Sequence, residues 1–168
     1  QPDRVNLTYR VMYGDEQTLT MHDDGQAPDT VASDGVYTAA IPAGTAQAGE
    51  MLRYYVTTHD SQGGSFREPY LANPWQTSAQ PMYRGTVIAD DNVDTPLPVL
   101  SWFVPNPNWH LSGGGNNTNW SPAAVFYDGR FYDNLQVRVR GLTTVNWTKP
   151  KFKFEFNDGD EFVYDPDE

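Results

Sequence analysis

Short β-prone stretches, interrupted every few residues by turn formers, are the feature of this chain that most limits its fold. The apolar runs are rich in Val, Thr, Tyr and Phe, and Gly, Pro, Asn or Asp breaks them at close intervals. No segment of about 11 residues or more spaces its apolar residues as an amphipathic helix does. The sequence therefore predicts a mainly β protein. The expected strands are 5–12, 17–22, 35–41, 51–58, 82–89, 97–103, 123–127, 130–132, 134–140, 151–156 and 161–164.

One tight turn is specified by local sequence alone. In "YDGRFY" (127–132), Asp128 and Gly129 stand between two aromatic-flanked runs. A two-residue hairpin of type I′ needs positive φ at both central positions, which favours Asp followed by Gly. We therefore expect a β-hairpin centred on this dipeptide.

A polar stretch, "DDNVDTP" (90–96), divides the strand pattern into two units. Residues 1–92 hold several short strands in a length typical of an Ig-like β-sandwich. Residues 93–168 restart with the apolar run "LPVLSWFV" and end in an acidic segment without apolar closure after Tyr164. We therefore expect an antiparallel β-sandwich followed by an antiparallel sheet that is cut short. Its open edge, near 161–164, would accept a partner strand.

The overall charge excludes some classes of partner. The chain carries a net charge of −11 and has a sequence pI of about 4.5, whereas nucleic-acid binding needs a basic surface. It has no cysteine, so disulfides and thiolate chemistry are excluded. No run approaches the roughly 20 apolar residues of a membrane-spanning helix. These observations predict no nucleic-acid partner and no membrane span.

An acidic loop in the first unit is a candidate calcium site. Asp23, Asp24, Asp29 and Asp34 fall within twelve positions that also contain glycine. Ca²⁺ takes several oxygen ligands from a loop that can wrap around it, although the spacing here is not that of an EF-hand. The alternative is that each aspartate caps its own turn by accepting backbone N–H groups.

A basic cluster stands out against the acidic background. All three lysines lie between 149 and 153, and Arg138 and Arg140 precede them. Because strand side chains alternate, Arg138 and Arg140 would share one face with Lys151 and Lys153, opposite the valines and phenylalanines. Such a face can hold a phosphate through arginine forks and lysine point charges. It can equally be the solvated side of an amphipathic hairpin.

The first unit resembles an Ig-like module of large bacterial extracellular proteins. The resemblance rests on the acidic loop, on "SDGVYTAAIP" and on "LRYYVTTHDSQGG", and it covers about residues 5–69. It implies a spacer or presentation module.

The second unit resembles the opening β region of the CotH kinase family, which comprises atypical kinases. The stretch "AAVFYDGRFYDNLQVRVRGLTTVNWTKPKFKFEFNDGDEF" carries the resemblance, together with "LPVLSWFV", over about residues 96–164. The matching residues are Tyr127, Gly129, Tyr132, Asn134, Arg138, Arg140, Gly141, Lys149, Phe152, Lys153 and Phe156.

The kinase resemblance implies phosphoryl transfer from ATP, with Mg²⁺, to Ser or Thr of extracellular proteins. It makes Lys149 or Lys153 the phosphate anchor, with Arg138 and Arg140 shaping the surroundings. The family's catalytic and metal-binding aspartates would follow residue 168, so we expect no catalytic residue in this chain. The implied protein is a fragment of a secreted or surface bacterial kinase that is inactive alone, and its missing C-terminal half is the expected partner.

Two other functions remain open on the sequence. The chain can be a non-catalytic adhesion or matrix module that binds calcium through the aspartate loop and glycan through Trp109 and Trp120. It can also be a structural spacer.

Overall fold

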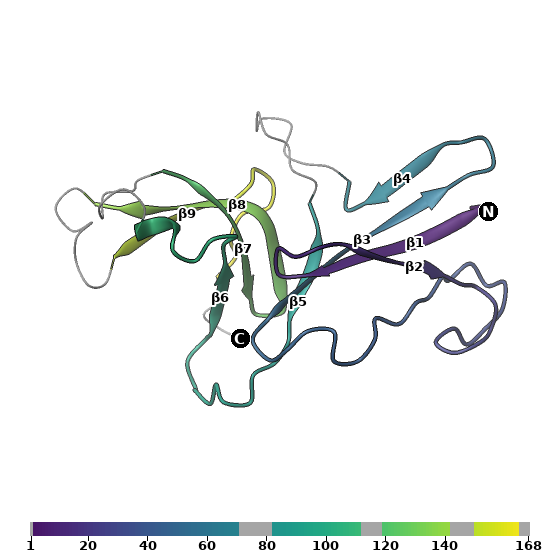
Figure 1. Cartoon of the computed structure of the whole chain (residues 1–168), viewed down its shortest axis with the longest axis horizontal. Helices are drawn as coiled ribbons and strands as arrows, with labels where there is room; N and C mark the ends of the chain where they lie inside the picture. Colours follow the sequence, from purple (N-terminus) through teal and green to yellow (C-terminus); the bar gives the residue numbers. More distant parts are fainter. Residues whose placement is uncertain (1, 71–81, 112–118, 142–149, 165–168) are drawn as a thin grey trace.

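The structure, a computed structural model, describes residues 2–70, 82–111, 119–141 and 150–164. These residues form two antiparallel sheets, one of five strands and one of four (Figure 1). Within these ranges the only helical element is a single 3₁₀ turn, η1 (Trp109–Leu111), and no helix is long and apolar enough to cross a membrane. The predicted mainly β class is confirmed.

The first sheet is built around a long central strand. Its strands are β1 (Arg4–Val11), β2 (Gln17–Met21), β3 (Met51–His59), β4 (Ser65–Glu68) and β5 (Arg84–Val87). The order is β2-β1-β3-β4, and β5 pairs with the first half of β3 while β4 pairs with its second half. Every strand among the described residues of 2–92 belongs to this one sheet. The described part of the first unit is therefore a single sheet rather than two packed sheets.

The expected strand 35–41 is reduced to one isolated bridge between His22 and Thr38. The reason is local, because Asp23 and Asp34, which precede it, accept backbone N–H groups and fold the chain into turns up to Val36. Sequence reasoning also missed β4, which is only four residues long.

The second sheet has the order β6-β7-β8-β9 (Figure 1). Its strands are β6 (Leu100–Phe103), β7 (Ser121–Tyr127), β8 (Arg130–Arg140) and β9 (Lys151–Glu155). The predicted hairpin is confirmed: Tyr127 pairs with Arg130, and Asp128 and Gly129 have φ values of 48° and 69°. The hydrophobic core lies on one face of this sheet, where Val125, Leu135 and Val137 are almost fully buried.

The expected strand 161–164 is absent. Phe162 packs instead against the rings of Tyr127, Tyr132 and Phe156, and the Val163 N–H donates to the Tyr132 hydroxyl at 3.1 Å. The partly buried Phe162 ring packs against the core cluster, and this segment forms no strand at the sheet edge. Among the described residues, the free edge beyond β8 is therefore β9.

A β-bulge in β8 changes which side chains of the strand face the core. Between Tyr132 and Leu135 the strand has one residue more than its partner β7 has between Val125 and Ala123. Asn134 accommodates the extra residue with a φ of 56°. Tyr132 and Leu135 consequently both join the core. Asp133, between them, is directed to the first sheet, where it binds Arg53.

A buried ion pair joins the two sheets. Arg53 of β3 donates from Nη2 to Asp133 Oδ1 at 2.6 Å, and their side chains are only 6% and 1% exposed. The Tyr83 N–H donates to the other carboxylate oxygen at 2.8 Å. Burial raises the pKa of Asp133, and the Arg53 guanidinium and the Tyr83 N–H oppose this rise.

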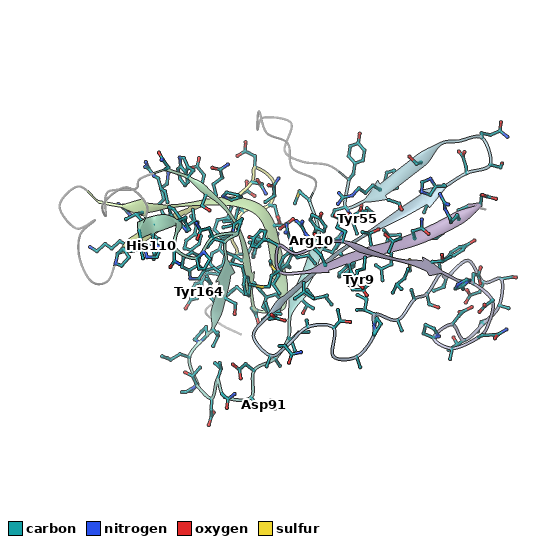
Figure 2. The ribbon with its side chains drawn as sticks, viewed as in Figure 1. Tyr9, Arg10, Tyr55, Asp91, His110 and Tyr164 are labelled. Atoms are coloured by element: carbon teal, nitrogen blue, oxygen red, sulfur yellow. The ribbon has the colours of Figure 1, made fainter. Side chains whose placement is uncertain are left out.

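Aromatic rings enclose the arginine of this pair. The guanidinium carbon of Arg53 lies 4.3 Å from the ring centre of Tyr83 and 5.0 Å from that of Tyr13. Arg10, labelled in Figure 2 beside Tyr55, stacks on Tyr83 at 4.4 Å. The Tyr13 hydroxyl donates to the Phe103 carbonyl of the second sheet at 3.0 Å. The two sheets therefore meet at a junction of charged and aromatic side chains. The chain passes from the first sheet to the second at the stretch where the sequence predicts a boundary between two units.

Candidate basic site on the β8–β9 hairpin

Four cations lie on one face of the β8–β9 hairpin. The register places Arg138 opposite Lys153 and Arg140 opposite Lys151. Residues directly opposite in an antiparallel pair extend their side chains to the same face of the sheet. On the other face, Val137 and Val139 are buried and Phe152 and Phe154 pack against them. The structure thus brings Arg138, Arg140 and Lys153 together, as predicted, whereas Lys149 lies outside the described residues.

Trp120 lies beneath the inner pair of cations. Its ring centre is 4.8 Å from the Arg138 guanidinium carbon and 5.4 Å from Lys153 Nζ. Both distances are within the range of cation–π attraction. Sequence reasoning considered Trp120 only as a glycan-binding residue. Its place beside Arg138 follows from the β7–β8 register, in which Ser121 faces Val137. The two-residue turn alone would place Ser121 opposite Gln136, and the bulge in β8 shifts the pairing by one residue.

The face is positively charged in an otherwise acidic chain. Its one ion pair among the described residues joins Lys153 Nζ to Glu155 Oε2 at 3.3 Å, between side chains that are 45% and 58% exposed. Such a surface pair contributes little, about 0–1 kcal/mol. Like charges directly opposite each other on a sheet repel. Arg138 Nε is buried and has no hydrogen-bond partner among the described residues. A bound anion would reduce the repulsion between the cations and could accept a hydrogen bond from Arg138 Nε.

The aspartate loop has a different character, because its carboxylates bind the backbone of the loop itself. Asp23 accepts the N–H groups of Asp34 and Gly35, at 3.1 and 3.0 Å, one on each oxygen. Asp24 accepts the Gln26 N–H at 2.9 Å, and Asp34 accepts the Val36 N–H at the same distance.

Asp29 caps a turn of the same loop. It is buried and accepts the Gly25 N–H at 2.6 Å and the Thr30 N–H at 2.8 Å. These bonds, that from Gly25 first, lower the pKa of Asp29 below its usual value. Among the described residues no group of three His, Asp or Glu side chains is placed to hold a metal ion. The geometry is that of turn-capping aspartates, and calcium binding here stays a prediction.

The two loop tryptophans do not form an exposed pair. Trp109, in η1, is 7% exposed and belongs to the core of the second sheet, where its ring lies 6.4 Å from that of Phe152. Trp120 is 38% exposed. The prediction that both present a glycan-stacking surface is wrong for Trp109, because burial of its large ring completes the core.

No protein family model, curated protein or solved structure matches this chain. The basic face of the hairpin therefore has to be interpreted from its own geometry.

Proposed function

We propose that the basic face of the β8–β9 hairpin binds the phosphate groups of a nucleotide, as part of a CotH-type kinase. One observation carries the proposal: two like-charge pairs face each other across β8 and β9 with a tryptophan ring beneath one of them. Arginine supplies a planar fork and lysine a mobile point charge, and polyphosphates are bound by this combination.

Each side chain has a distinct role in this proposal. Arg138 lies closest to the Trp120 ring, so its guanidinium is pre-oriented. Lys153 also lies over this ring, and its exposed ion pair with Glu155 can be exchanged for a phosphate. Lys149, by its family resemblance, is the other candidate anchor. Arg140 and Lys151, two residues along each strand from Arg138 and Lys153, extend the face far enough for more than one phosphate group.

The wider assignment rests on the sequence resemblances. In it the nucleotide is ATP with Mg²⁺, and the catalytic and metal-binding aspartates belong to a C-terminal kinase half that pairs with this chain. The first unit, a single sheet in its described part, presents the kinase portion outside a bacterial cell, where an extracellular protein is the substrate. Its likeness to Ig-like modules rests on the sequence resemblance alone. The chain by itself binds nucleotide without turnover.

Hydrogen exchange with and without MgATP tests the proposal. We expect ATP to slow exchange in residues 130–141 and 150–155, and Arg138→Gln with Lys153→Gln to weaken ATP binding by about tenfold or more. The matched control is Arg4→Gln, which removes an exposed cation from β1 of the other sheet. Equal weakening by the control, or no protection of the hairpin by ATP, would overturn the proposal.

Thermal melting with calcium or with MgATP distinguishes the rival functions. An adhesion module that uses the aspartate loop predicts a calcium-dependent rise in melting temperature and no nucleotide effect. A structural spacer predicts indifference to both ligands.

A further inference from the structure

We propose that the open edge of the second sheet at β9 binds an extended acidic peptide segment, which adds to the sheet as a further strand. The segment would alternate acidic residues with apolar ones. This inference does not rest on nucleotide binding. It shares the lysines of the proposed phosphate site, but it also uses the backbone edge of β9 and the apolar interior of the sheet, which nucleotide binding does not require.

The first observation is that the two edge strands of the sheet, β6 and β9, approach each other with no described strand between them. Among the described residues, β9 pairs only with β8, and β6 pairs only with β7. The sheet curves so far that Trp102 of β6 contacts two rings of β9, with ring centres 5.0 Å from Phe152 and 5.4 Å from Phe154. An edge with unpaired backbone N–H and C=O groups is a template for an added strand.

The second observation is an apolar pocket beside this edge. It has a volume of about 400 Å³, and its wall includes Met12, Tyr13, Trp102, Phe103, His110 and Phe152. His110, labelled in Figure 2, reaches it from η1 and lies 6.0 Å from the Phe152 ring. Phe152 belongs to both features, since its backbone lies in the free edge and its ring lines the pocket. A strand added at Phe152 would therefore direct its apolar side chains toward this pocket.

The third observation sets the chemistry of the occupant. Lys151 and Lys153 are exposed on the opposite face of β9, with Arg138 and Arg140 behind them, and Glu155 is the one carboxylate paired there among the described residues. Residues of an added strand next to these lysines would meet positive charge. Opposite charges across strands stabilise pairing and like charges oppose it. The lysines that discourage pairing with neutral or basic strands thus select an acidic one.

Binding of synthetic peptides to the whole chain tests the proposal. The probe is a labelled peptide of about eight residues in which Asp or Glu alternates with Val or Phe. The matched probe carries Lys in place of every acid. We expect the acidic peptide to bind, to slow hydrogen exchange in 151–155 and to dissociate as salt is added, while the basic peptide does not bind.

Two sets of variants assign the binding to this edge. We expect Lys151→Glu with Lys153→Glu to weaken binding by about tenfold or more, while Arg4→Glu on the other sheet leaves it unchanged. Pro107→Glu, at an exposed position of the pocket wall, should weaken peptide binding and leave ATP binding unchanged. That variant separates the peptide proposal from the nucleotide proposal.

The proposal is overturned if both peptides bind equally, which indicates only apolar adhesion. It is also overturned if the lysine reversals have no effect on peptide binding, if protection falls outside β9, or if a second copy of the chain occupies the edge in solution.

Discussion

Asp133 shows how much one side chain can control in this molecule. The residue before it and the second residue after it, Tyr132 and Leu135, are core residues of the second sheet. Asp133 itself, 1% exposed, reaches Arg53 of the first sheet. A buried carboxylate and a buried guanidinium each lose much hydration, so each depends on the other for compensation. The remaining nitrogens of Arg53, Nε and Nη1, are buried without a hydrogen-bond partner among the described residues, and two tyrosine rings cover this side chain.

We expect Asp133→Asn to lower the free energy of unfolding by about 3–5 kcal/mol, because it leaves a buried arginine without its counter-charge. Urea unfolding measures the change. The control is Asp160→Asn, which breaks the surface pair with Arg130 and should cost less than about 1 kcal/mol. The double change Arg53→Met with Asp133→Leu should recover most of the loss. Equal effects of the buried and surface changes would contradict this account.

Two tyrosines at the same junction make the folding stability depend on alkaline pH. Burial raises the pKa of Tyr13 and of Tyr83 to about 12, and the hydrogen bond to Glu16 adds to the effect on Tyr83. An unfolded tyrosine has a pKa of about 10. Between these two pKa values the unfolded chain releases phenolic protons that the folded chain retains, so stability falls as the pH rises from about 10 to 12.

We expect Tyr13→Phe to make this alkaline loss of stability shallower, because one of the two shifted phenols is removed. The slope of unfolding free energy against pH measures it, and phenolate absorbance of the folded protein gives an independent reading. The slope is compared rather than the absolute stability, since Tyr13→Phe also loses the hydrogen bond to Phe103. An unchanged slope would show that Tyr13 does not titrate as described.

At the scale of elements, the β7–β8 hairpin is specified by its two turn residues. Gly129 has a φ of 69°, and a Cβ placed there would meet no atom within 4 Å. The cost of a side chain at this position is therefore backbone strain and not crowding. Left-handed backbone costs an ordinary residue about 1–2 kcal/mol.

We expect Gly129→Ala to destabilise the protein by about 1–2 kcal/mol and Gly129→Asn by less, because Asn tolerates this conformation. Thermal or urea unfolding distinguishes the two. If Asn and Ala were equally destabilising, a contact of the turn rather than its φ angle would be responsible.

At the scale of the whole molecule, the two sheets are coupled where β5 crosses β8. Gly85 allows this approach: a Cβ at this position would lie 2.6 Å from the ring of Phe131. Glycine is needed at position 85 because the neighbouring sheet lies so close, and not because of a special backbone conformation.

We expect Gly85→Ala to destabilise the protein by about 1–3 kcal/mol through crowding against Phe131. In a double-mutant cycle with Phe131→Ala, the two effects should be clearly non-additive, since the second change removes the obstacle. Unfolding followed separately by signals from each sheet should still give one transition. Additive effects would indicate that the junction is looser than the structure describes.

Much of the fold follows from the sequence because its determinants are local. Alternation of side chains predicted the opposed faces of β8 and β9, and Asp128-Gly129 predicted their neighbouring hairpin turn. The two strands expected at 130–132 and 134–140 are one continuous strand, β8, which carries a bulge where Asn134 has positive φ. Turn capping by the loop aspartates was one of two interpretations that the sequence left open.

The remaining features depend on contacts between distant residues. The sequence by itself determined the mainly β class, the basic face of the hairpin and the turn between β7 and β8. Only the tertiary structure decided that Asp133 meets Arg53, that Trp120 lies beneath Arg138 and that Trp109 is buried. It also decided that, among the described residues, β9 rather than 161–164 is the free edge. The physical reason is that strand alternation and turn conformation are properties of neighbouring residues, whereas register, curvature and burial are decided by which distant surfaces exclude water together.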